Sequence, residues 1–219
     1  MNSELDLTTR NYEPFPEVLA PFPAEVYRNI RVLLASNSPR RRELLSLIMP
    51  TFQIAVKRDI QETYPSDLKV EKIPEYLSKL KAAAYADMLT ENELIITADT
   101  VVILDDKVLG KPKDAASAKK MLADLADKEH KVITGVTLSS RSGKRIDTFS
   151  ETTSVHFSSL TEQEIDEYVS RFAPLDKAGS YGIQEWIGAA AIDRIDGCFY
   201  NVMGLPLHKL YTHLKTFFD

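Results

Sequence analysis

An aspartate interrupts the most strand-like segment of this chain. Residues 94–104 (LIITADTVVIL) predict a buried strand, and Asp99 stands in its middle. A buried carboxylate has to be neutralised, paired with a cation or bound to a metal ion, because an isolated buried charge is strongly unfavourable. Since α/β folds place their sites at strand ends, Asp99 and Thr100 are candidates for a cleft. The structural alternative is an aspartate that is hydrogen-bonded to turn backbone.

Three consecutive arginines follow an expected strand-to-helix turn. Residues 31–35 (RVLLA) predict a short buried strand, and Ser38 and Pro39 suit the N-cap and the first position of a helix. A helix N-terminus favours an anion, and guanidinium groups pair with phosphate oxygens two at a time. Residues from Ser36 to Arg42 therefore indicate a phosphate site. The alternative is a capped helix with a solvated basic face.

Two further segments carry polar side chains on glycine-containing loops. Lys111 lies in a Gly-Lys-Pro turn, where it can pair with Asp99 or hold a phosphate. Residues 176–184 (DKAGSYGIQ) end on Gln184, whose amide both donates and accepts and so suits the edge of a nucleotide base. Taken singly, the two side chains have ordinary explanations as a solvated lysine and a loop glutamine bonded to backbone.

Predicted helices and strands alternate along the chain, which favours an α/β fold. Residues 1–30, with several Asn, Tyr and Pro, predict a loosely packed N-terminal extension before a domain over residues 31–219. Strands are expected at 31–35, 52–56, 94–104, 108–109, 132–138 and 148–157. Helices are expected at about 39–49, 74–88, 114–126, 161–172 and 206–217.

Composition excludes several classes of function. The formal charge of −5 gives no general attraction to nucleic acid or to anionic lipid. Cys198 is the only cysteine, the four histidines lack zinc-ligand spacing, and no apolar run is long enough to cross a bilayer. No charged-then-apolar leader opens the sequence. We therefore expect a cytoplasmic protein that binds neither nucleic acid nor membrane.

The order of these motifs resembles the Maf family of nucleotide pyrophosphatases. The resemblance runs from about Val32 to Leu210 and leaves residues 1–30 outside. The matching pieces are SNSPRR at 36–41, Glu62, LKAAAYA with Lys81, ADTVV with Asp99, GKP with Lys111, HKVITGV, DKAGSYGIQ and NVMGLPL. Their order along the chain is far more specific than any single motif.

This resemblance implies a fold shared with the inosine triphosphate pyrophosphatase group, in which a mixed twisted sheet is flanked by helices and a cleft separates two lobes. It implies a divalent metal ion, Mg²⁺ or Mn²⁺, and cleavage between the α and β phosphates. Carried over by position, Asp99 is the proton acceptor or a metal ligand, and Glu62 assists with the metal. Arg41, Lys81 and Lys111 hold phosphates, and Ser36 contributes to the substrate site.

Within the family, the SYGIQ segment resembles the branch that acts on dTTP and UTP. Arg40, Thr100 and Gln184 fall at the positions associated with that choice. A pyrimidine edge with a carbonyl and an N3–H satisfies an amide that both donates and accepts. Glu185-Trp186 departs from the commoner pattern of a glycine and an aromatic residue, and the extra carboxylate beside the expected base pocket could alter selectivity.

A rival hypothesis from another class is a nucleotide-binding regulator of septum formation with little catalysis. The lone aspartate in an apolar strand favours catalysis, because a pure binder does not need it. A nucleic-acid-binding domain is disfavoured by the acidic balance of charge. The resemblance also makes a homodimer the expected assembly.

Overall fold

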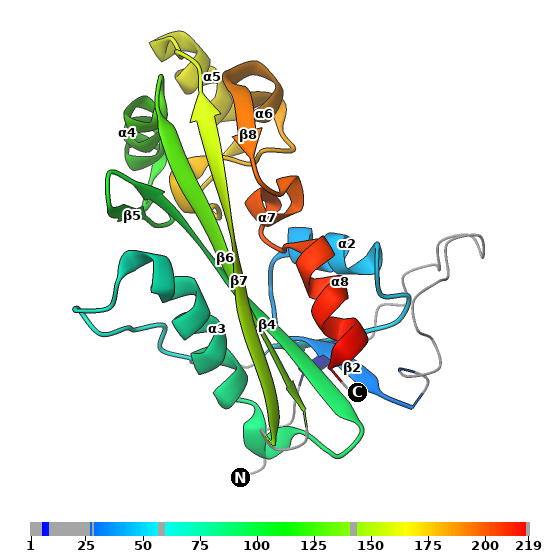
Figure 1. Ribbon diagram of the computed structural model, residues 1–219. Helices are drawn as coiled ribbons and strands as arrows, with labels where there is room; N and C mark the ends of the chain where they lie inside the picture. Colours follow the sequence, from blue (N-terminus) through cyan, green and yellow to red (C-terminus); the bar gives the residue numbers. More distant parts are fainter. Residues whose placement is uncertain (1–5, 9–26, 28, 57–59, 141–143, 218–219) are drawn as a thin grey trace.

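One mixed sheet of eight strands organises the protein (Figure 1). The computed structural model describes residues 6–8, 27, 29–56, 60–140 and 144–217. The strand order is β1-β3-β2-β4-β6-β7-β8, and β5 pairs with β4 outside this path. The strands are β1 (Asp6–Thr8), β2 (Arg31–Leu34), β3 (Gln53–Val56), β4 (Glu93–Leu104), β5 (Lys107–Leu109), β6 (Glu129–Ser140), β7 (Arg145–Phe157) and β8 (Ile192–Asp196).

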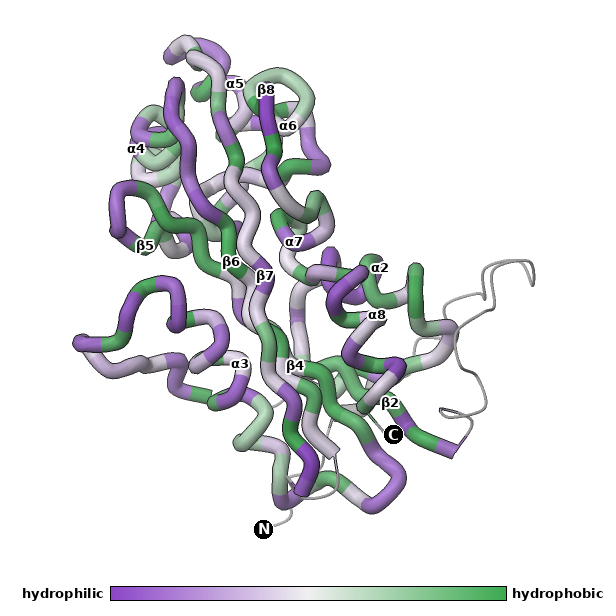
Figure 2. The backbone as a smooth tube through the Cα atoms, in the orientation of Figure 1, coloured by the Kyte–Doolittle hydropathy of each residue, from purple (hydrophilic) through white to green (hydrophobic). Residues whose placement is uncertain are grey.

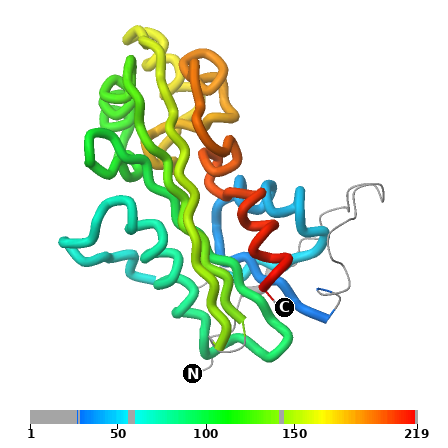
Figure 3. The backbone as a smooth tube through the Cα atoms, in the orientation of Figure 1, coloured from blue at the N-terminus to red at the C-terminus, as the bar shows by residue number. Residues whose placement is uncertain are grey.

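Helices pack on this sheet at both of its ends. They are α2 (Pro39–Ser46), α3 (Ile73–Ala83), α4 (Ala115–Leu125), α5 (Glu162–Phe172), α6 (Trp186–Ala191), α7 (Phe199–Met203) and α8 (Leu207–Thr216). The three long strands β4, β6 and β7 run through the whole molecule, as Figure 3 traces. They carry α4, α5, α6 and β8 at one end and α2, α3, α8 and β2 at the other (Figure 1). The α/β prediction, with a mixed sheet flanked by helices, is confirmed.

Each end of the sheet has its own hydrophobic core. In one, Leu44 and Leu45 of α2 and Leu210 of α8 pack with buried side chains of β2 and β4. In the other, residues of α4, α5 and α6 cluster with the far ends of β4, β6 and β7. Figure 2 shows β4 as a largely hydrophobic strand; the polar pair Asp99-Thr100 interrupts its apolar sequence, and of the two only Thr100 is partly exposed. The predicted break in an apolar strand therefore lies between the two cores.

Local sequence signals set the starts of three helices as expected. The Ser38 hydroxyl caps α2 by accepting from the Arg41 N–H, with Pro39 in the first turn. Asp114 caps α4, and Thr161 forms a capping box at α5. The expected end of the first helix is wrong, because α2 stops at Ser46 rather than near residue 49. Helical hydrogen bonds give way to a turn ahead of Pro50.

Other expected boundaries also shift. The α3 helix ends at Ala83, and residues 86–88 form a separate 3-10 turn rather than its last turn. β6 and β7 are longer than predicted, because their antiparallel pairing continues from Glu129↔His156 to Ser140↔Arg145. Part of the expected extension joins the domain: β1 pairs antiparallel with β3, and the Tyr27 hydroxyl donates to Leu214 O at 2.6 Å. Most of residues 1–30 lies outside the described residues.

The helices in the described parts of the chain do not meet the requirements for crossing a membrane. None of these described helices combines the length and the apolar character that a bilayer crossing requires.

Gly135 of β6 allows α3 to lie directly on the sheet. It pairs with Asp99 across β4 and β6, and a Cβ at this position would overlap the Pro74 carbonyl at the start of α3. Because that contact is with backbone, no side-chain rotation can relieve it. The glycine of the HKVITGV motif therefore sets the distance between α3 and the strand that carries Asp99.

We predict that Gly135→Ala lowers the free energy of unfolding by about 3 kcal/mol, since α3 has to move away from the sheet. Gly110→Ala is the matched control, because a Cβ at Gly110 meets nothing within 4 Å, and its effect should stay within about 0.5 kcal/mol. Urea unfolding of both variants measures the difference. Equal effects at the two positions would show that α3 does not require the close approach.

Candidate functional site

A large cleft, with a volume of about 1000 Å³, brings together the residues that the motifs single out. It lies against the middle of β4, where residues 98–102 line it. All nine predicted site residues line it: Ser36, Arg40, Arg41, Glu62, Lys81, Asp99, Thr100, Lys111 and Gln184. Segments that are more than 100 residues apart in sequence thus meet at one site, although their roles stay predictions.

An ion pair between Lys81 and Asp99 forms the floor of this cleft. The Lys81 Nζ lies 2.7 Å from an Asp99 carboxylate oxygen and 2.9 Å from the carboxylate of Glu62. The Lys81 and Asp99 side chains are 13% and 12% exposed, whereas Glu62 is half exposed at 51%. The cation that the buried aspartate requires is therefore Lys81, and Lys111 does not fill that place.

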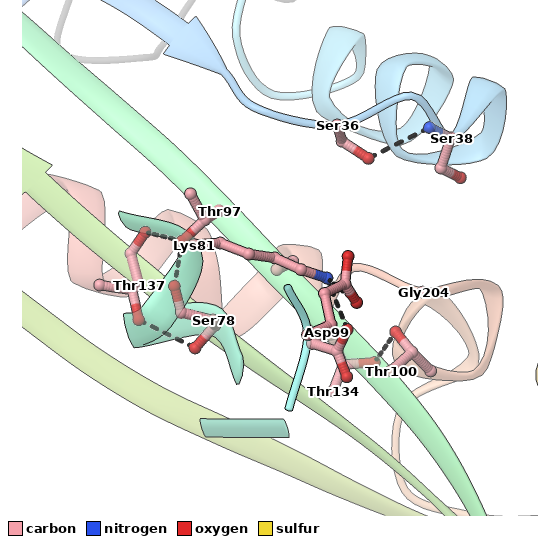
Figure 4. A network of polar contacts seen from close by, with 12 residues as sticks. Ser36, Ser38, Ser78, Lys81, Thr97, Asp99, Thr100, Thr134, Thr137 and Gly204 are labelled. Atoms are coloured by element: carbon pink, nitrogen blue, oxygen red, sulfur yellow. Dashed lines mark hydrogen bonds and ion pairs between the residues drawn. The ribbon is translucent and has the colours of Figure 1, made fainter. Parts of the chain in front are cut away.

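Lys81 reaches Asp99 because hydrogen bonds fasten α3 to the sheet one turn earlier. The Ser78 hydroxyl bonds with the Thr137 hydroxyl at 2.9 Å, and the Thr97 hydroxyl donates to Ser78 O at 2.7 Å. Figure 4 shows this network beside the extended Lys81 side chain, which points along β4 to Asp99. Sequence analysis missed Ser78, Thr97 and Thr137, because single hydroxyl residues carry no recognisable signal.

Arg41 connects three segments rather than standing free in the cleft. Its guanidinium donates to Gly204 O at 2.8 Å, to Ala98 O at 2.9 Å and to the Thr100 hydroxyl at 3.0 Å. Burial lowers the pKa of Arg41, and the charge of Asp99 opposes that shift. Arg41 thus joins the first turn of α2 to both sides of Asp99, while its predicted contact with phosphate stays untested.

Arg40 spans the cleft to its opposite wall. Its guanidinium lies 2.7 Å from the Asp176 carboxylate, which also accepts from Lys177 at 2.8 Å. Burial raises the pKa of Asp176, but the hydrogen bonds from Lys177 and Arg40 outweigh it and bring the pKa to about 2. Asp176 and Lys177 belong to the DKAGSYGIQ segment, so the motif signalled this wall without identifying these two side chains.

Three predicted residues keep polar groups available to a ligand. Lys111 is exposed and has no ion-pair partner within the described ranges. Gln184 is exposed in the cleft lining. The Ser36 hydroxyl accepts from Ser38 N at 3.2 Å and keeps its own proton for donation.

Tyr181 supports the wall that carries Gln184. Its hydroxyl is 2.7 Å from His130 Nε2. The Tyr181 ring packs edge to face against the rings of His130 and Phe157. Burial lowers the pKa of His130 from 6.5 to about 4 and raises the pKa of Tyr181, so both groups are neutral at neutral pH. The histidine of the HKVITGV motif thus has a structural explanation in this contact.

The charge of the cleft is opposite to that of the chain. Its described lining contains five basic and three acidic side chains, in a protein whose formal charge is −5. Low-dielectric walls strengthen the field of such a cluster. A large cleft with a local positive excess fits an anion with several negative charges, such as a polyphosphate.

The acidic residues of the cleft fit a hard divalent cation only in part. The described residues contain no group of three or more histidine, cysteine, aspartate or glutamate side chains that could hold a metal ion. Asp99 and Glu62 nevertheless direct carboxylate oxygens at the same ammonium. Mg²⁺ is commonly held by one or two carboxylates together with substrate phosphates. The donor set therefore fits a metal ion that arrives with a phosphorylated ligand.

Fold and site together define an α/β protein with a large, predominantly basic cleft that holds a lysine-paired carboxylate. The family model described as "Maf-like protein" matches residues 31–217, and the chain belongs to this family. A dTTP/UTP pyrophosphatase of Porphyromonas gingivalis is 50% identical over 192 residues, which cover 87% of this chain and 96% of that protein. Proteins of the same name from Phocaeicola vulgatus and Bacteroides thetaiotaomicron are 50% and 48% identical over 185 residues, covering 84% of this chain and 95% of each relative.

We predict that Arg41→Lys lowers the free energy of unfolding by about 2 kcal/mol, because an ammonium cannot reach three acceptors in the geometry of a guanidinium. Arg42→Lys is the matched control, because its Nε has no hydrogen-bond partner in the parts that the structure describes, and it should change stability by less than about 0.5 kcal/mol. Chemical denaturation of the two variants gives the comparison. A silent Arg41→Lys would contradict the connecting role.

Proposed function

We propose that this protein hydrolyses dTTP and UTP to the nucleoside monophosphate and pyrophosphate. The observation that carries the proposal is the paired carboxylate of Asp99 on the floor of a basic cleft large enough for a nucleotide. The relatives named dTTP/UTP pyrophosphatase, at about half identity over most of the chain, support the same activity.

The basic side chains that a nucleotide can reach in the cleft bind its phosphates. Lys111 is exposed in the lining and can donate to a phosphate oxygen. Lys81 stands beside the carboxylate and can neutralise charge that develops on the reacting phosphates. Arg41 supports this region through the backbone on both sides of Asp99.

Asp99 acts as the proton acceptor for the attacking water. The water oxygen bonds to phosphorus, the P–O bond between the α and β phosphates breaks, and the proton passes to the carboxylate. Lys81 holds the carboxylate at 2.7 Å and fixes its position before the substrate arrives. Pyrophosphate leaves with the electron pair of the broken P–O bond.

A divalent cation, Mg²⁺ or Mn²⁺, is the cofactor that we propose, with Asp99 and Glu62 as its protein ligands. When bound, such an ion withdraws charge from phosphate oxygens and makes the phosphorus more electrophilic. The half-exposed Glu62 side chain can turn toward the ligand, because among the described residues Lys81 is its one ion-pair partner. Lys81 therefore has a second role, which is to hold the carboxylates of Asp99 and Glu62 close together.

Recognition of the base is assigned to Gln184, together with Arg40 and Thr100 at the neighbouring wall. The Thr100 hydroxyl is already engaged with Arg41 and Thr134, so its contribution is to shape the pocket. Gln184 is exposed in the lining and presents a donor and an acceptor. Such an amide matches the carbonyl and N3–H of uracil and thymine. The substrates are free nucleotides, so we also propose that the protein acts in the cytoplasm, and a homodimer stays a prediction.

We predict that Asp99→Asn still binds UTP but loses turnover by about a thousandfold, because the amide cannot accept the proton. Pyrophosphate release from dTTP, UTP, CTP, ATP and GTP, with Mg²⁺, with Mn²⁺ and with a chelator, measures the activity of both proteins. Chelation should abolish release by the unmodified protein. Asp106→Asn is the control, because Asp106 lies in the exposed turn between β4 and β5 and outside the cleft lining.

Three results would count against this proposal or a part of it. Turnover retained by Asp99→Asn would remove the carboxylate from its assigned role. Nucleotide binding without pyrophosphate release from any substrate would favour the rival hypothesis of a nucleotide-binding regulator of septum formation. Release mainly from a purine nucleotide would leave the reaction in place and overturn the choice of base.

A further inference from the structure

Glu185 is a partly buried carboxylate directly behind the predicted base-binding amide. Its side chain is 18% exposed, and one oxygen lies 3.1 Å from the Lys177 Nζ. Its other oxygen accepts from the Tyr168 hydroxyl, which in turn accepts from Gly182 N at 3.2 Å. Burial raises the pKa of Tyr168, and its hydrogen bond to Glu185 adds to that shift, so the phenol stays a donor. The function proposed above uses neither Glu185 nor Tyr168.

These contacts make Glu185 part of the wall rather than a ligand of the base. Both of its oxygens have protein donors, and its charge is compensated by a lysine that is itself buried. Glu185 does not belong to the cleft lining, whereas the adjacent Gln184 does. Its effect on a substrate must therefore act through another side chain.

Gln184 is the side chain through which Glu185 can act. A Cβ at Gly182 would lie 2.9 Å from Glu185 Cδ and 3.1 Å from Gln184 Nε2. Both side chains thus approach the same point above Gly182, and the amide atom of Gln184 nearest to that point is its nitrogen. A rotation of that amide by half a turn would place its oxygen on the side of the Glu185 carboxylate, which is electrostatically unfavourable.

The orientation of this amide decides which pyrimidine it matches. Uracil and thymine present a carbonyl acceptor and an N3–H donor, whereas cytosine presents an amino donor and an N3 acceptor. An amide that is free to turn exchanges its donor and acceptor and serves both edges. An amide held in one orientation leaves an unpaired group against the wrong base, which costs affinity.

We infer that Glu185 is a positioning residue that fixes the orientation of the Gln184 amide and so selects uracil and thymine over cytosine. The inference rests on the proposed function, since it concerns the same cleft and the same class of substrate. Lys177 and Tyr168 hold the carboxylate in place, and Gly182 leaves room for the two side chains above it.

Glu185→Gln is the variant that tests this inference. It keeps the size of the side chain, Tyr168 can still donate to its amide oxygen, and Lys177 keeps its ion pair with Asp176. We expect the ratio of kcat/KM for UTP over CTP to fall by at least about tenfold, while kcat for UTP changes by less than about threefold. A merely structural role would lower both substrates together and leave the ratio unchanged.

Two further variants keep the test decisive. Tyr168→Phe removes the donor that holds the carboxylate, and we expect it to lower the same ratio to a smaller extent. Glu167→Gln on the exposed face of α5 is the control for loss of one negative charge and should leave the ratio unchanged. Thermal denaturation establishes that each variant is folded. If Glu185→Gln fails to fold, the ratio in Tyr168→Phe decides.

The inference and the proposed function can fail separately. Pyrophosphate release from UTP with an unchanged UTP-to-CTP ratio in folded Glu185→Gln would overturn the inference alone. No release from any nucleotide would overturn the proposed function. In that case the affinities of the unmodified protein and of Glu185→Gln for UTP and CTP, measured by calorimetry, still test the inference, and an equal ratio of affinities in the two proteins would contradict it.

Discussion

The ion pair between Lys81 and Asp99 is the interaction on which the rest of the cleft depends. A carboxylate in the middle of a buried strand is tolerated only with a cation beside it, and that cation comes from a helix rather than from the same strand. The helix can supply it only by lying directly on the sheet, which Gly135 permits and the hydroxyl of Ser78 secures. Gly135 of one motif and Lys81 of another thus both contribute to the ion pair with Asp99. The contact of Lys81 with Glu62 extends this ion pair toward solvent.

The sheet places this ion pair between two separate cores, and that position gives the cleft its shape. Long strands tie both ends of the molecule together. The helices α2 and α8 pack on one part of the sheet and α4, α5 and α6 on the other, while α3 reaches past Asp99 to Val101 and Ile103. Arginines of α2 then connect the walls: Arg41 contacts Ala98 and Gly204, and Arg40 contacts Asp176. Arg40 thereby pairs with a carboxylate, whereas Arg41 donates to backbone carbonyls, and both contacts join α2 to the other walls of the cleft.

The sequence predicted features that depend on local physics and missed those that depend on distant partners. The cap at Ser38 and the polar break at Asp99 were visible, because each is encoded within a few neighbouring residues. The partners of Arg41 were not, since two of its three acceptors are backbone carbonyls 57 and 163 positions away, and a carbonyl leaves no mark on the sequence. The edge strand β8 was missed for a different reason: its residues IDRID are mostly exposed and charged, and they lack the apolar alternation that identifies a strand. The order of the motifs predicted the nine site residues that line the cleft. Their distances and interaction partners could be read only from the folded structure.

The central claim is that one nucleotide lies in this cleft with its phosphates beside the Lys81–Asp99 pair. A crystal structure with Mn²⁺ and a UTP analogue that carries a methylene group between the α and β phosphates tests it most directly, because anomalous scattering locates the metal independently of the model. The account predicts a metal peak within bonding distance of an Asp99 oxygen, phosphate oxygens at Lys81 and Lys111, and the uracil edge at Gln184. An analogue bound elsewhere, or bound in the cleft with its triphosphate directed away from Asp99, would contradict it.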